Sequence, residues 1–61
     1  MTDPLWRMPR VLEETGLSRS ALYRHIDAGR FPKPKKLGPR TNVWPASQVE
    51  AAKAQLLEHY N

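Results

Sequence analysis

The apolar positions of this chain recur at helical spacing in three segments that glycine and proline separate. The first segment, residues 9–15, places Val11, Leu12 and Thr15 on its inner side. Gly16 follows as a helix stop, because glycine accepts the left-handed backbone conformation without strain. The pattern therefore predicts a first helix of about two turns.

A second helix is predicted directly after the turn "TGLS". Ser18 suits the N-cap, because its hydroxyl can accept a hydrogen bond from a free backbone N–H, and the helix then runs to about Ala28 before Gly29. At about 100° per residue, Leu22 and Ile26 fall together on the core side. The other side is a polar arc of about 140° that holds Arg19, Ser20, Tyr23, Arg24 and Asp27. Two short helices joined by a tight turn with a glycine are typical of the helix-turn-helix motif.

The segment after the second helix has no helical period, and Gly38-Pro39 marks a turn within it. We expect a short β-hairpin here, roughly residues 35–37 against 42–44. Trp44, at its end, is expected to close the gap between the hairpin and the helices. The expected tip of the hairpin is basic and carries Lys35, Lys36 and Arg40.

The last segment, "PASQVEAAKAQLLEHY", predicts a helix that packs on the core. Its apolar stripe consists of Val49, Ala52, Leu56 and Tyr60. Two helix starts fit the sequence, with either Pro45 as the first helical residue or Ser47 as the cap. At the other end, residues 1–8 are expected to form an N-terminal arm, because Pro4 interrupts regular strand pairing. Residues 9–60 would then form one small domain.

The distribution of charge indicates an anionic partner. The chain carries ten Lys and Arg residues against six Asp and Glu residues, a net charge of +4. Seven of the ten basic residues lie in residues 19–40, together with only one acid, Asp27. A surface that is merely solvated has no reason to segregate its charge in this way. Nucleic acid is therefore the first candidate partner, and an anionic membrane surface is the second.

Other classes of function find little support in the sequence. Cysteine is absent, which removes disulfides and thiolate metal sites. His25 and His59 are far apart and have no metal-type spacing, and no glycine motif that cradles phosphate is present. We therefore expect no enzymatic activity, no cofactor, no metal and no small-molecule ligand. Because no apolar run is long enough to span a membrane and the N-terminus lacks a signal core, we expect a cytoplasmic protein.

Three pieces of the sequence, "TGLSRSALYR", "GRFPKPKKLGPR" and "W..S.VEA", together resemble the AlpA-type phage and prophage regulators. The resemblance covers about residues 7–53. Such regulators are small winged helix-turn-helix proteins, related to the DNA-binding heads of MerR regulators and to phage excisionases. The resemblance implies a mainly α fold of three helices, with a small β-hairpin, the wing, between the second and third helices. Because the sequence ends at Asn61, we expect neither the long dimerisation helix nor the sensor domain of MerR proteins.

The resemblance also implies where double-stranded DNA would bind. The second helix, about residues 18–28, would enter the major groove, and the wing, about residues 33–42, would lie on the backbone or in the minor groove. Phosphate contacts from Lys and Arg supply affinity, whereas contacts to base edges supply specificity. The residues expected at this interface are Arg19, Ser20, Tyr23, Arg24, Lys33, Lys35, Lys36 and Arg40.

The leading function hypothesis is a sequence-specific DNA-binding regulator of transcription. An excisionase-type factor, which bends DNA for a recombinase, uses the same fold, and the sequence does not separate the two. A third hypothesis, from another class, is a protein-interaction module whose basic face docks an acidic partner. A single module of this size buries only about 600–1,000 Å² on DNA, so we expect protomers to associate cooperatively on DNA.

Overall fold

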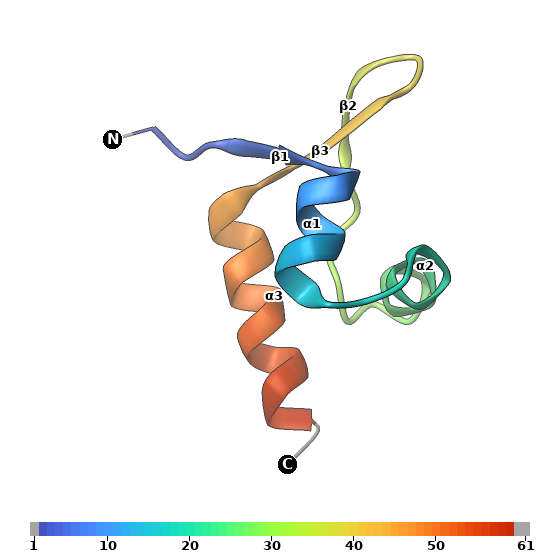
Figure 1. Cartoon of the computed structure of the whole chain (residues 1–61), viewed down its shortest axis with the longest axis vertical. Helices are drawn as coiled ribbons and strands as arrows, with labels where there is room; N and C mark the ends of the chain where they lie inside the picture. Colours follow the sequence, from blue (N-terminus) through green and yellow to red (C-terminus); the bar gives the residue numbers. More distant parts are fainter. Residues whose placement is uncertain (1, 60–61) are drawn as a thin grey trace.

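The protein, described over residues 2–59 by a computed structural model, contains three helices and one antiparallel sheet in that range (Figure 1). The elements in chain order are β1 (Leu5–Arg7), α1 (Met8–Thr15), α2 (Arg19–Asp27), β2 (Lys35–Gly38), β3 (Thr41–Pro45) and α3 (Ala46–His59). The sheet has the order β1-β3-β2. In Figure 1, α1 lies between α2 and α3, and the hairpin of β2 and β3 extends beyond the helices. The predicted class, mainly α with a wing between the second and third helices, is confirmed.

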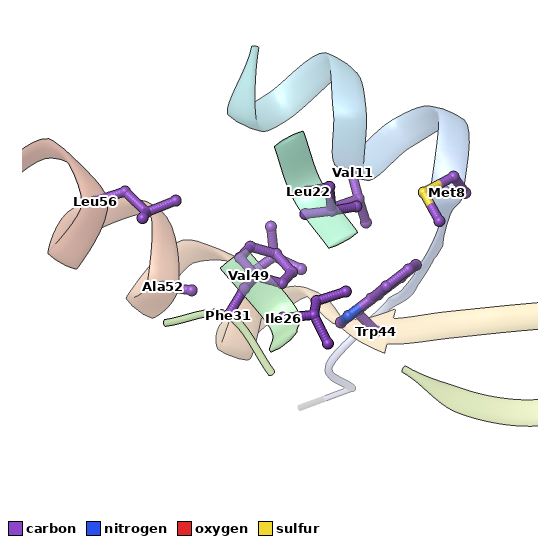
Figure 2. Packing of buried hydrophobic residues seen from close by; sticks show 9 residues of the cluster. All are labelled: Met8, Val11, Leu22, Ile26, Phe31, Trp44, Val49, Ala52 and Leu56. Atoms are coloured by element: carbon purple, nitrogen blue, oxygen red, sulfur yellow. The ribbon is translucent and has the colours of Figure 1, made fainter. Parts of the chain in front are cut away.

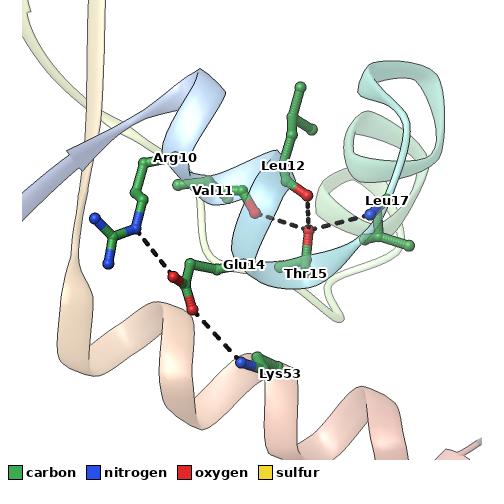
Figure 3. Close-up of polar contacts among 7 residues, drawn as sticks. All are labelled: Arg10, Val11, Leu12, Glu14, Thr15, Leu17 and Lys53. Atoms are coloured by element: carbon green, nitrogen blue, oxygen red, sulfur yellow. Dashed lines mark hydrogen bonds and ion pairs between the residues drawn. The ribbon is translucent and has the colours of Figure 1, made fainter.

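The turn between α1 and α2 has the caps that the sequence predicts. Gly16 adopts a φ of 72°, and its N–H donates to the carbonyl of Leu12 at 2.8 Å. The hydroxyl oxygen of Ser18 accepts a hydrogen bond from the N–H of Ala21 at 3.2 Å. Thr15 adds a bond within α1, since its hydroxyl donates to the carbonyl of Val11 at 2.8 Å (Figure 3). These local bonds set the direction of α2 relative to α1.

The C-terminus of α2 closes in a Schellman motif. Gly29 has a φ of 79°, and its N–H donates to the carbonyl of Ile26 at 3.1 Å. The N–H of Arg30 donates to the carbonyl of His25 at 2.9 Å. The motif turns the chain sharply, so that Arg30 lies beside the last turn of the helix that it follows.

The core joins the sheet to all three helices, and Trp44 of β3 is fully buried in it. The indole N–H of Trp44 donates to the carbonyl of Pro32 at 2.9 Å. Its ring meets Phe31 edge-on, with ring centroids 6.3 Å apart. The other members of the cluster in Figure 2 are Met8, Val11, Leu22, Ile26, Val49, Ala52 and Leu56. The predicted core sides of α2 and α3 are confirmed over these residues, while Tyr60 lies outside the described range.

The N-terminal segment differs from the unpaired arm that we expected. Leu5–Arg7 form β1, which pairs antiparallel with β3 and places Trp6 opposite Trp44. Pro4 does not interrupt this pairing, because it precedes the strand, and its carbonyl accepts the N–H of Ala46 at 2.8 Å. A strand of three residues is too short to show an alternating pattern. Leu5–Arg7 form a strand because β3 lies beside them and pairs with them.

The start of α3 also differs from both expectations. Pro45 belongs to β3, and the helix begins at Ala46. The side chain that caps the helix belongs to Asp3 and not to Ser47. The N–H and the hydroxyl of Ser47 donate to the Asp3 carboxylate at 3.0 and 2.6 Å. A carboxylate at this position satisfies free N–H groups and complements the helix dipole. The hydrogen bonds from the side chain and the backbone of Ser47 lower the pKa of Asp3 below its ordinary value of 3.8.

The wing is the predicted hairpin, slightly longer than expected. Its strands are Lys35–Gly38 and Thr41–Pro45, with an irregular register at Leu37. The facing pairs are Lys35 with Val43, Lys36 with Asn42, and Gly38 with Thr41. Of the three residues expected at the tip, only Arg40 lies in the turn. Lys35 and Lys36 lie at the other end of the hairpin, because β2 continues past them to Gly38.

Glu14 links α1 to α3 (Figure 3). Its carboxylate accepts a hydrogen bond from Nε of Arg10 at 3.0 Å and lies 3.6 Å from Nζ of Lys53. The Arg10 guanidinium also stacks 4.6 Å from the ring centre of Trp6, which connects α1 with β1. Partly exposed ion pairs of this kind contribute at most about 1 kcal/mol each. The helices are therefore held mainly by the apolar core.

We expect Trp44→Ala to lower the free energy of unfolding by about 3–5 kcal/mol, because it leaves a large cavity and an unpaired Pro32 carbonyl. This loss is comparable with the whole stability of a domain of this size. Urea denaturation followed by circular dichroism measures it. Trp6→Ala, at a half-buried position of β1, is the control and should cost less. A Trp44→Ala protein with the wild-type unfolding midpoint would contradict this account of the core.

The cap on α3 predicts a pH dependence of stability. Since the pKa of Asp3 is lower in the folded protein than its ordinary value, its stabilising effect is present above that value and disappears as the pH falls through the folded pKa. Asp3→Ala should therefore melt below the wild type at neutral pH. The difference in melting temperature should shrink progressively below about pH 5. A difference that stays constant down to acid pH would show that the Asp3 charge is not involved.

Candidate nucleic-acid interface

The polar arc of α2 is exposed, as the sequence predicts. The exposed residues are Arg19, Ser20, Tyr23, Arg24 and Asp27. At about 100° per residue, Ser20, Arg24 and Asp27 lie roughly opposite the buried Leu22 and Ile26. We call these three residues the α2 ridge. They form the part of the helix that projects farthest from the core.

A groove of about 300 Å³ runs along the flank of α2 that faces the wing. Arg19 and Tyr23 line it from α2, and the start of α1 forms another part of its wall. The remaining lining residues are Arg7 from the end of β1 and Arg40, Thr41 and Asn42 from the wing. We call this feature the wing groove. It gathers three arginines from three elements that are far apart in the sequence.

The wing groove contains no acidic residue. Within residues 2–58, the ion pairs join Glu14 to Arg10 and to Lys53, so Arg7, Arg19 and Arg40 have no carboxylate partner there. Guanidinium groups gathered around one hollow repel one another, and an anion between them would relieve that repulsion. Arginine binds phosphate oxygens with two parallel N–H groups. The groove is therefore suited to a phosphate.

The three lysines predicted at the interface near the wing lie outside the wing groove. Lys33, Lys35 and Lys36 are all exposed, and none lines the wing groove. Neighbouring strand residues point to opposite faces, whereas facing residues share one. Lys36 therefore lies on the face of the sheet that carries Asn42, while Lys35 lies on the other face with Val43. A groove residue lies at both positions, Asn42 opposite Lys36 and Arg7 opposite Val43, so the strand register alone does not distinguish the two lysines.

Arg7 is a candidate site residue that the sequence did not indicate. It lies outside the basic segment, in the N-terminal arm that the sequence predicts. The pairing of β1 with β3 sets Arg7 opposite Val43, and this pairing carries it to the groove. Two features of the sequence could have pointed to Arg7. It lies just before the first helix, and it begins the stretch that resembles the AlpA-type regulators.

No cluster of three or more potential metal ligands occurs among the residues that the structure describes. None of the helices in residues 2–59 is both long enough and apolar enough to cross a membrane.

The match to a known protein family covers the whole candidate interface. The family model described as "Prophage CP4-57 regulatory protein (AlpA)" matches residues 5–53. A curated relative, "Uncharacterized protein ORF88" of Enterobacteria phage P4, is 42% identical over 45 residues, which is 74% of this chain. The match spans 51% of the phage protein, so the chain covers about half the length of the curated relative that it matches. No solved structure matches the chain.

Proposed function

This chain belongs to the AlpA family of prophage regulatory proteins, and from that premise we propose that it regulates transcription by binding specific sites on double-stranded DNA. The observation that carries the proposal is the position of the exposed α2 ridge beside an acid-free groove with three arginines. A helix with its side chains is about 10–12 Å wide, which fits a major groove of about 12 Å. The ridge would then meet base edges while the groove meets the backbone.

The α2 ridge carries side chains that can distinguish bases. Arg24 can donate two hydrogen bonds to guanine, and Ser20 can bond with several bases. Asp27 can accept a hydrogen bond from the amino group of cytosine. An exposed carboxylate opposes binding to phosphate, so its position on the ridge favours contact with a base over contact with the backbone. We therefore assign sequence recognition to Ser20, Arg24 and Asp27.

The wing groove would hold the DNA backbone. Arg7, Arg19 and Arg40 donate to phosphate oxygens, and the hydroxyl of Tyr23 adds one further donor. Such contacts supply affinity and register on the duplex but do not read its sequence. Lys36, which is exposed and faces the groove residue Asn42, adds a backbone contact. Lys33 and Lys35 contribute general electrostatic attraction.

Two substitutions separate these roles. Arg24→Ala should reduce the preference for the specific site over random duplex by about 1–3 kcal/mol, because it removes a base contact. Arg40→Ala should weaken binding to both duplexes equally and reduce the slope of log K against log salt by roughly one. Sequencing of protein-bound genomic fragments defines the site, and gel shift at several salt concentrations measures both effects.

Lys53→Ala, on α3, is the charge-matched control for this comparison. If the wild type binds no duplex, or binds all duplexes equally, the proposed function is wrong. The position of the bound sites also separates two roles of the same fold. Sites at promoters support a regulator, whereas sites confined to phage attachment sequences would point to an excisionase-type factor.

We also propose that protomers associate on DNA. One copy of α2 and one wing cover a short stretch of duplex, and an interface of this size is small for a specific complex. The free protein should be a monomer by light scattering. A duplex with two adjacent sites should be bound more tightly per site than a duplex with one. A tight dimer without DNA, or equal affinity per site on both duplexes, would contradict this.

A further inference from the structure

A second hollow lies on the flank of α2 away from the wing. It has a volume of about 260 Å³ and is lined by Leu17, Ala21, Arg24, His25 and Arg30. At about 100° per residue, Ala21 and His25 lie on the side of the α2 ridge opposite Arg19 and Tyr23. Like the wing groove, the hollow contains more than one arginine and no acidic residue. The ridge therefore has a basic hollow on each side.

Arg30 is held in this hollow by His25. Its Nε donates to Nδ1 of His25 at 3.1 Å, and its backbone N–H donates to the His25 carbonyl at 2.9 Å. Because a guanidinium only donates, Nδ1 is the acceptor, and this contact requires the imidazole tautomer that carries its proton on Nε2. The two terminal nitrogens of the guanidinium make no hydrogen bond to residues 2–58. They remain available to a ligand.

The hydrogen bond between the side chains of Arg30 and His25 is exposed, so it contributes little to the stability of the fold. An exposed arginine loses side-chain entropy when it is held in one conformation. Its partner here is an imidazole and not a carboxylate, so no ion pair with an acidic group offsets that loss. The exposed edge of the guanidinium instead resembles a group oriented in advance for an anion, because a fixed fork loses less entropy when it binds phosphate.

We propose that Arg30, together with Arg24, binds a phosphate of the DNA strand across the major groove from the wing, and that His25 acts as the positioning residue for Arg30. The inference rests on the proposed function. A helix that fills the major groove has one phosphate backbone along each flank. The wing groove would hold the backbone on one flank, and the Arg30 hollow holds the backbone on the other. Because Arg24 both reads a base and borders this hollow, Arg24→Ala should also weaken binding to random duplex, in addition to lowering the preference for the specific site.

The test compares single and double variants on the specific duplex and on a random duplex. Arg30→Ala should weaken binding to both duplexes by the same factor, several-fold, and lower the salt slope by roughly one. Arg30→Lys should restore the salt slope but not the full affinity, because lysine lacks the planar fork. His25→Ala should weaken binding less than Arg30→Ala. In the Arg30→Ala background, it should have no further effect.

Phosphate ethylation interference provides a readout that a purely structural role would not change. Wild-type protein should show interference at a phosphate on the strand across the groove from the wing, and Arg30→Ala should lose that signal alone. Arg40→Ala should keep it and lose a signal on the other strand. Circular dichroism and thermal melting confirm that each variant is folded, and Lys53→Ala is again the charge-matched control.

The outcomes separate this inference from the proposed function. If wild-type protein binds its site and Arg30→Ala binds equally well with the same interference pattern, the phosphate site is wrong while the regulator remains. If the effects of His25→Ala and Arg30→Ala simply add, Arg30 binds without being positioned by His25, and that part of the proposal fails. If the wild-type protein binds no DNA, both proposals are wrong.

Discussion

The burial of Trp44 is the interaction on which the rest of this structure depends. Trp44 lies in β3, which is the middle strand of the sheet and continues directly into α3. Its indole N–H bonds the carbonyl of Pro32, so it also fixes the segment that follows α2. A chain of this length buries only about 60% of the surface that its unfolded form exposes. One large aromatic side chain therefore accounts for an unusually large share of the core.

The position of β3 determines where the wing groove lies, and β3 shares the core with α2. Its first residues, Thr41 and Asn42, form one wall of the wing groove, while Trp44 packs in the core that also holds α2. Because the apolar side of α2 packs in the core, the helix is held in one orientation about its own axis. In this orientation the α2 ridge faces outward and has a hollow on each flank. The same core that stabilises the chain thus sets the orientation of every candidate DNA contact.

The basic surface has an energetic consequence for folding and for binding. Arg7, Arg19 and Arg40 come together only in the folded chain, so their mutual repulsion opposes folding. A bound phosphate would remove that repulsion and add charge-assisted hydrogen bonds. In the proposed complex, DNA would therefore stabilise the folded protein as well as being recognised by it. The acidic residues lie mostly outside this region, as in the case of Glu14 between α1 and α3.

The sequence by itself determined the local features of this protein. Gly16, Ser18 and Gly29 act through bonds within a few residues, and the period of Leu22 and Ile26 identifies the core side of α2. Because this period identifies the core side of α2, the exposed polar arc on its other side could also be predicted. Contacts between distant segments were decided only by the tertiary structure. No local pattern shows that Leu5–Arg7 become a strand, that Asp3 caps α3, or that Arg7 reaches Arg19 and Arg40. These features depend on β3 as a shared partner, and pairing across such distances leaves no period in the sequence.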